Sequence, residues 1–219
     1  MIKNAREIKL LACAARITKE IWDVVSKDIK PGKTEKEIKR GLEAQISKRE
    51  LKRSFKTIVA SGPNGSKPHA APTERKIKAG DFVVVDFGVI YKGYHSDMTR
   101  TAQTGKAKTK MKNLYKVVEE AHSLAIRSIK PGIKISDLVK KTHNYIRKEK
   151  LGQYILHSLG HGVGKKIHEA PKLSEKNNGR LQKNMVITIE PGLYVRGRGG
   201  VRIEDMVLVG TSGAKVLTQ

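Results

Sequence analysis

The sequence predicts an α+β fold in which two α/β halves, each an antiparallel sheet backed by helices, are related by a pseudo-twofold axis. Two observations lead to this prediction. The segment Ile-Lys-Pro-Gly occurs at 29–32 and again at 129–132. A helix, a second helix, a strand and a hairpin also follow in the same order in both parts, with acidic residues at matching places. Strands grouped with helix pairs are typical of antiparallel sheets covered by helices.

The first half begins with amphipathic helices. Thr34 and Glu37 form a capping box at the start of the second one. A wholly apolar strand then carries Asp86 at its end. The elements expected here are helices over 4–27 and 34–49, strands over 55–61 and 82–85, and a hairpin of strands 89–91 and 94–101.

The second half is expected to repeat this order, with Ser136 capping its second helix as Thr34 does in the first. The elements expected here are helices over 112–128 and 136–150, a strand over 154–156, and a hairpin of strands 184–190 and 201–206. In this alignment the matching pairs are Glu190 with Asp86, Glu204 with Asp97, and His168 with His69. We expect one domain over 1–219, made of repeats at about 1–108 and 109–219.

Size and composition restrict the class of protein. The chain of 219 residues is 38% hydrophobic and 30% charged, as in a globular protein with its own core. No apolar run approaches the ~20 residues of a membrane span. Cys13 is the single cysteine, which excludes an internal disulfide and makes a cytoplasmic location the expectation.

The formal net charge of +24 makes a weak contact with nucleic acid or another polyanion plausible. The lysines are dispersed, however, and aromatic residues make up only 5% of the chain, too few for a base-stacking surface. The Arg- and Gly-rich segment 196–200 lies between two strand-like runs. It is therefore interpreted as a hairpin turn.

Histidines are concentrated in the segment 154–171, which holds His157, His161 and His168 among glycines. Neutral imidazole binds borderline metals and transfers protons near pH 7. Pairing of the two halves would also bring four acids together, namely Asp86, Asp97, Glu190 and Glu204. Carboxylates ~4 Å apart repel one another strongly, so the cluster must hold protons or bind cations. Two divalent ions with one histidine ligand would satisfy the cluster and suit two-metal hydrolysis.

Five short motifs follow one another along the chain: Asp-Phe-Gly at 86–88, His-Ser-Asp-Met-Thr-Arg-Thr at 95–101, His-Ser-Leu-Gly-His-Gly-Val-Gly at 157–164, Ile-Glu-Pro-Gly at 189–192 and Gly-Val-Arg-Ile-Glu-Asp at 200–205. In this order they resemble the motifs of the pita-bread metallopeptidases. That group contains methionine aminopeptidases, Xaa-Pro aminopeptidases and Xaa-Pro dipeptidases. The resemblance implies two divalent ions, commonly manganese, cobalt or zinc, and a hydroxide that attacks the scissile carbonyl. The implied metal ligands are Asp86, Asp97, His161, Glu190 and Glu204.

The resemblance also implies roles in catalysis. Glu190 would accept a proton from the attacking water, while His69 and His168 would bind the substrate backbone and the oxyanion. His157, Arg202 and Gly192 favour the Xaa-Pro branch, so the expected substrate is a peptide with proline at its second position. His157 or His168 is the hypothetical proton donor to the proline nitrogen, and Arg202 is expected near the metals and the substrate.

The chain is expected to be the catalytic domain alone, because Xaa-Pro peptidases usually carry a further N-terminal domain that is absent here. Two alternatives stay open. One is a methionine aminopeptidase or an aminopeptidase of broader specificity. The other is a non-catalytic pita-bread module that binds the ribosome or nucleic acid. The oligomeric state cannot be inferred from the resemblance.

Overall fold

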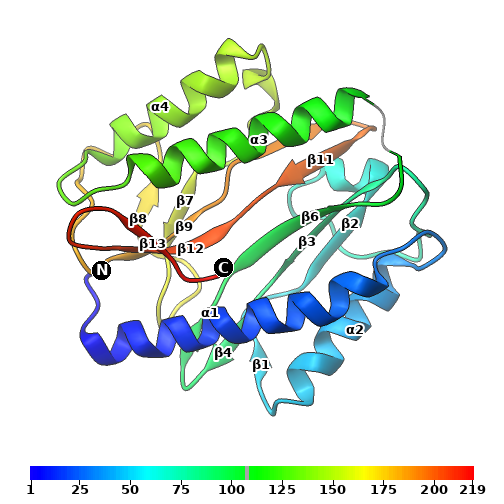
Figure 1. The fold of residues 1–219 in the computed structure, drawn as a ribbon, viewed down its shortest axis with the longest axis horizontal. Helices are drawn as coiled ribbons and strands as arrows, with labels where there is room; N and C mark the ends of the chain where they lie inside the picture. Colours follow the sequence, from blue (N-terminus) through cyan, green and yellow to red (C-terminus); the bar gives the residue numbers. More distant parts are fainter. Residues whose placement is uncertain (107–108) are drawn as a thin grey trace.

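The computed structural model describes residues 1–106 and 109–219 and has the predicted α+β architecture. Figure 1 shows helices α1 and α2 on one side of the strands and helices α3 and α4 on the other. The predicted boundary between repeats, near residue 108, falls on residues outside those described. No helix within the described residues has the length and apolar character needed to cross a lipid bilayer.

The first part of the chain contains two long helices and six strands. Thr34 caps α2 as predicted: its Oγ1 accepts a hydrogen bond from Glu37 N at 3.1 Å, and its N–H donates to Glu37 Oε2 at 2.7 Å. The elements are α1 (Ala5–Val25), η1 (Ser26–Asp28), α2 (Glu35–Ser47), β1 (Lys52–Arg53), β2 (Ile58–Ser61), η2 (Gly62–Ser66), β3 (Phe82–Phe87), β4 (Val89–Tyr91), β5 (Tyr94–His95) and β6 (Met98–Gln103).

The second part of the chain has another helix pair, followed by seven strands. Its elements are α3 (Thr109–Ser128), α4 (Ile135–Lys148), η3 (Gly152–Tyr154), β7 (Gly160–Gly162), β8 (Glu169–Leu173), β9 (Val186–Ile189), β10 (Gly192–Val195), β11 (Gly199–Arg202), β12 (Asp205–Val209) and β13 (Ala214–Val216). Residues 196–198 join β10 to β11 in an antiparallel hairpin, so the predicted turn lies here, although Gly199 and Gly200 already belong to β11.

The strands form antiparallel sheets, of which two carry the fold. The first has the order β2-β3-β6 and the second has the order β13-β12-β9-β7-β8. Apolar residues of α1 and α2 pack on the first sheet, and those of α3 and α4 pack on the second. A further cluster joins Leu11 and Ala15 of α1 to Val186 and Met206 of the second sheet. The two parts therefore share one core.

Two local predictions for the second part are wrong. Ser136 does not cap α4, because the N-cap is Lys134 and Ser136 lies inside the first helical turn. The residue one hundred positions after Thr34 is Lys134, so the match with Ser136 was two residues out of step. Residues 154–156 are not a strand either: Tyr154 ends the short helix η3, and the strand that pairs with β9 is β7.

The strand register also corrects one predicted equivalence. Asp86 pairs with Thr99 between β3 and β6, whereas Ile189 pairs with Asp205 between β9 and β12. Continuing the second register by one residue sets Glu190 opposite Glu204. Glu204 thus corresponds to Thr99 in the first sheet, and not to Asp97.

Candidate metal and peptide site

A cavity of about 1090 Å³ lies where the two main sheets meet. All the residues singled out from the sequence line this cavity: His69, Asp86, Asp97, His157, His161, His168, Glu190, Arg202 and Glu204. The convergence of residues 135 positions apart in the chain is what the duplicated architecture predicted.

The four acids lie at or near the ends of strands. Asp86 is the penultimate residue of β3, Asp97 directly precedes β6, Glu190 directly follows β9, and Glu204 lies between β11 and β12. At these positions the backbone bonds of the sheets fix each Cα. The residues Asp86, Asp97 and Glu204 are buried, with at most 9% of their surface exposed. The negative charge of buried acids must be balanced by protons, cations or hydrogen-bond donors within the cavity.

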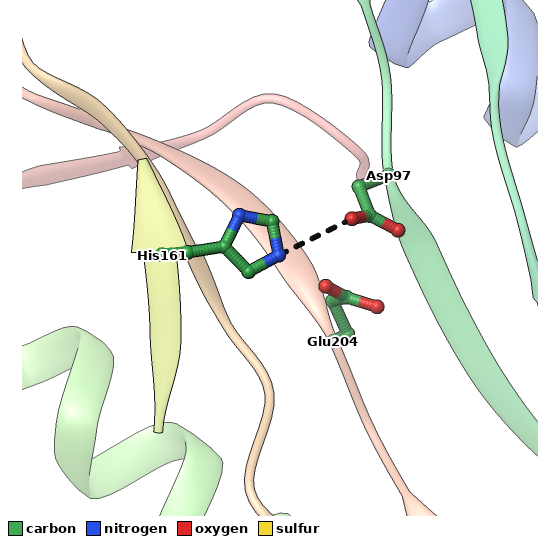
Figure 2. A group of neighbouring side chains, drawn as sticks. All are labelled: Asp97, His161 and Glu204. Carbon is green, nitrogen blue, oxygen red and sulfur yellow. Dashed lines mark ion pairs between the residues drawn. The ribbon is translucent and has the colours of Figure 1, made fainter. Parts of the chain in front are cut away.

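His161 lies at the centre of the acidic cluster, in the middle of β7. Its Nδ1 is 2.9 Å from the backbone oxygen of Gly162, which directs Nε2 toward the acids. His161 Nε2 is 3.5 Å from Asp97 Oδ2 and 3.5 Å from Glu190 Oε1. Possible ligand atoms of Asp97, His161 and Glu204 all lie within 4.8 Å of one another, and Figure 2 shows these side chains pointing toward a common point.

Burial and mutual repulsion raise the pKa values of three acids in the cluster. Burial raises the pKa of Asp97 well above its usual value, and Asp86 and Glu190 raise it further. Burial likewise raises the pKa of Glu204, reinforced by Asp97 and Glu190. Burial also raises the pKa of Glu190, although His161 opposes the shift. The cluster is therefore stabilised by protons or by bound cations.

The donor atoms fit divalent cations. Asp86 Oδ1 is buried, and among the described residues it has no hydrogen-bond partner. Four carboxylates and one imidazole also form the mixed oxygen and nitrogen donor set that suits manganese, cobalt or zinc. An orphaned carboxylate oxygen beside such a set is the feature expected of a metal ligand.

Arg202, in β11, lies beside the acids and is 3% exposed. Its Nη2 donates to Asp86 Oδ2 at 2.6 Å, and its Nη1 donates to Tyr194 Oη at 2.6 Å. Nη1 also donates to the backbone oxygen of Pro68 at 3.2 Å, while Nε donates to Thr99 Oγ1 at 3.0 Å. Most of its N–H groups are thus committed within the protein. This arrangement orients Asp86 and leaves little capacity for a direct contact with substrate.

His157 lies next to Glu190, with its Nδ1 3.8 Å from Glu190 Oε2. Its Nε2 is 2.8 Å from Tyr194 Oη, and its Nδ1 is 2.8 Å from the backbone oxygen of Ser158. Burial lowers the pKa of His157 to about 4 despite that carbonyl. The ring is therefore neutral at pH 7, with Nδ1–H donating to Ser158 and Nε2 accepting from Tyr194. A neutral ring held in this way is a poor proton donor.

His69 and His168 are both exposed and border the cavity. His69 lies on the loop after η2, and His168 directly precedes β8. The rings of His168 and His161 meet edge to face, with centroids 4.4 Å apart. Burial, followed by the neighbouring His161, lowers the pKa of His168. These two histidines are the most exposed of the site residues named above.

Three residues of the site were not predicted. Thr99 Oγ1 donates to Glu204 Oε2 at 2.6 Å. Thr188 Oγ1 accepts from the backbone N–H of His161 at 3.0 Å and lies 3.3 Å from Glu190 Oε1. Tyr194 connects Arg202 to His157. Thr99 and Thr188 each lie two residues from an acid of the cluster, so side-chain alternation along the strands could have identified both.

Comparisons with known proteins identify the family to which this chain is similar. The profile of metallopeptidase family M24 matches residues 9–211. An Xaa-Pro dipeptidase of Pyrococcus horikoshii is 40% identical over 220 residues, covering all of this chain and 63% of the relative. The solved structure of an Xaa-Pro dipeptidase from Bacillus anthracis superposes with a TM-score of 0.97 at 41% identity, covering 100% of this chain and 62% of that one.

A further solved structure, an X-Pro aminopeptidase from Thermotoga maritima, has a TM-score of 0.96 at 35% identity. The superposition covers 100% of this chain and 62% of the aminopeptidase. The present chain thus spans a little under two thirds of the length of these relatives. The part they share includes the whole cavity described above.

Proposed function

This chain belongs to metallopeptidase family M24, and from that premise we propose that it is a metal-dependent exopeptidase that hydrolyses the bond before proline at the second position of a peptide. The observation that carries the proposal is the meeting of four carboxylates and His161 in one cavity. The relatives named Xaa-Pro dipeptidase and X-Pro aminopeptidase support the preference for proline. The methionine-specific and non-catalytic alternatives have no comparable support.

Two divalent ions are proposed for the cluster, held by Asp86, Asp97, His161, Glu190 and Glu204. Manganese, cobalt and zinc all fit this donor set. Bound there, they would supply Lewis acidity for the attack of water on the scissile carbonyl. The orphaned Oδ1 of Asp86 and the raised pKa values of Asp97 and Glu204 support this assignment.

The other residues divide between binding and proton transfer. Glu190 is the proposed proton acceptor from the attacking water, oriented by Thr188. His69 and His168 would bind the substrate backbone and the developing oxyanion. His168 is the better candidate for proton delivery to the proline nitrogen, since it is exposed, whereas both ring nitrogens of His157 are held within the protein. Arg202 would keep Asp86 in place.

One experiment tests the proposal. The protein is freed of metal, reloaded with manganese, cobalt or zinc, and assayed on Xaa-Pro dipeptides, longer peptides that begin Xaa-Pro, and Met-Ala peptides. We expect metal-dependent release of the first residue before proline, with Glu190→Gln nearly inactive. Equal cleavage of Met-Ala and Xaa-Pro peptides would contradict the proline preference. The two proline substrates also distinguish dipeptidase from aminopeptidase activity.

Several properties stay predictions. The single cysteine favours a cytoplasmic location. The charge of +24 favours weak contact with polyanions, which binding measurements at several salt concentrations would detect. The single domain over 1–219 with two repeats is proposed on the common core described above.

A further inference from the structure

Glu35 is a buried carboxylate outside the acidic cluster. It is the first residue of α2, and none of its surface is exposed. Glu35 Oε1 accepts hydrogen bonds from Ser61 N at 2.7 Å and Ser61 Oγ at 2.8 Å. Glu35 Oε2 accepts from Thr73 N at 2.9 Å and Thr73 Oγ1 at 2.7 Å. Asn64 Nδ2 lies 3.1 Å from both oxygens. One side chain thus ties together the two ends of the loop 62–72.

Neutral groups compensate the charge of Glu35. None of the ion pairs found in residues 1–106 and 109–219 involves this residue. The amino-terminal end of α2 favours an anion at this position, and the backbone and side-chain donors satisfy both oxygens. Helix formation does not require an acid here, because the corresponding residue of α4 is Ile135, which packs in the apolar core. The carboxylate therefore serves the loop rather than the helix.

The loop 62–72 forms part of the cavity wall and carries His69. In its middle, the backbone oxygen of Pro68 accepts a hydrogen bond from Arg202, which also holds Asp86. Gly65 packs so closely on Gly200 of β11 that an added Cβ would lie 3.2 Å from the Gly200 nitrogen. Glu35 therefore fixes the base of a loop whose centre is held by Arg202, the residue that also holds Asp86 of the acidic cluster.

We propose that Glu35 is a positioning residue that holds His69 in register with the metal-binding acids. The inference rests on the proposed function, since His69 matters only if a peptide is bound and cleaved. His69 is exposed, so its own surroundings do little to orient it. A displacement of a substrate-binding group by about 1 Å lowers turnover by about 100-fold. Loosening the loop would therefore impair catalysis without touching the metal ligands.

The test uses Glu35→Gln, which keeps the side-chain size but turns one acceptor oxygen into an N–H donor. Its matched control is Glu37→Gln on the same helix, where the carboxylate caps the helix and does not contact the loop. We expect Glu35→Gln to lower kcat on an Xaa-Pro substrate by about 10- to 100-fold, with manganese affinity unchanged. Glu37→Gln should retain wild-type kcat and KM.

A double-mutant cycle with His69→Ala separates positioning from general destabilisation. If Glu35 acts through His69, adding Glu35→Gln to His69→Ala should cause little further loss of kcat. Multiplicative losses would overturn the proposal. Thr73→Val provides a milder second variant, because it removes one donor to Glu35 from an exposed residue. It should reproduce part of the kcat loss.

Amide hydrogen exchange tests the clamp without an activity assay. Glu35→Gln should speed exchange in residues 61–73 and leave β9 and β12 unchanged. Unchanged exchange in 61–73 would overturn the clamp even if the peptidase proposal stands. If the wild type proves inactive on every peptide, the proposed function fails, and the catalytic role of Glu35 fails with it. Faster exchange in Glu35→Gln would then support only the structural role of Glu35 in holding the loop.

Discussion

Thr99 connects the acids contributed by the two sheets. Its hydroxyl donates to Glu204 and accepts from Arg202, and Arg202 in turn donates to Asp86. These hydrogen bonds connect Asp86 in β3, through Arg202 in β11 and Thr99 in β6, to Glu204. Partners that orient metal-binding carboxylates commonly change metal affinity when they are removed. Thr99 therefore tests whether the cluster acts as one unit.

For Thr99→Val we expect manganese affinity to fall by about 10- to 100-fold, because Glu204 loses the hydroxyl that orients it. Titration calorimetry on metal-free protein measures the change. Thr142→Val is the matched control: Thr142 is also buried, and within residues 1–106 and 109–219 its hydroxyl bonds only to Leu138 of its own helix. Wild-type affinity in Thr99→Val would show that the acids are positioned by the backbone alone.

Lys3 and Glu169 form an ion pair with only 3% of either side chain exposed. Burial raises the pKa of Glu169, but Lys3 and the N–H of Lys166 outweigh it, so the pKa lies below its usual value of 4.5. A lowered carboxyl pKa stabilises the folded state above about pH 4.5, and this stabilisation is lost as the pH falls further.

Glu169→Gln should reduce the free energy of unfolding at pH 7 by about 3 to 5 kcal/mol, because Lys3 stays buried without its partner. Its deficit relative to wild type should shrink as the pH falls below about 4.5. Urea unfolding at several pH values measures both effects. Glu20→Gln, which removes an exposed partner of Arg16, should cost at most about 1 kcal/mol. A loss of unfolding free energy in Glu169→Gln that does not change with pH would refute the lowered pKa of Glu169.

The acids and histidines that line the cavity could be predicted to lie together, because they occur in short motifs near the ends of strands. The roles of Arg202 and His157 were less accessible. The hydrogen bonds of Arg202 to Pro68 and of His157 to Tyr194 join segments that are far apart in the chain, and one sequence does not encode such contacts in a local pattern. Glu35 illustrates the same limit, since it is the first residue of a helix, a position where an acid is ordinary.

The position of β7 depends on a glycine, Gly160. A Cβ at Gly160 would lie 2.1 Å from the backbone oxygen of Thr188, in β9. The strand also carries His161, so its close approach to β9 sets the distance between His161 and Glu190. The proposed metal site therefore requires a residue without a side chain at position 160.

Gly160→Ala should lower both the Tm and the manganese affinity, because β7 must move away from β9. Gly41→Ala is the contrasting control in α2: its Cβ would meet only Val25 Cγ1, at 3.7 Å. That change should stabilise the protein by about 0.5 to 1 kcal/mol and leave metal binding unaltered. Calorimetric melting with and without manganese compares the two. An unchanged Tm for Gly160→Ala would contradict the steric argument.

At the level of elements, the sequence predicted the helices better than the short strands. Long amphipathic helices have a clear period, and the capping box at Thr34 marks a start unambiguously. Lys134 offers no such signal, so the start of α4 was misassigned to Ser136. The strand β7 spans only Gly160–Gly162 and lacks an alternating apolar pattern, so its pairing with β9 is set by tertiary packing.

In the whole molecule, one core extends across both sheets, with α1 contacting each of them. Because the acids come from both sheets, ions that bind them must also stabilise the association of the sheets. We expect each manganese ion, at 100 times its Kd, to add about 2.7 kcal/mol to the free energy of unfolding. Denaturant titrations with and without manganese measure the gain. An equal gain in Glu204→Gln would place the ion elsewhere.

The contrast between a net charge of +24 and an acidic cavity has a kinetic consequence. A dication far from the surface meets repulsion from the whole protein and is attracted only near the opening. Added inert salt screens the long-range repulsion first, since the Debye length shrinks to about 8 Å at 0.15 M. The rate of manganese uptake in stopped-flow mixing should therefore rise with ionic strength, whereas oppositely charged partners usually associate more slowly in salt.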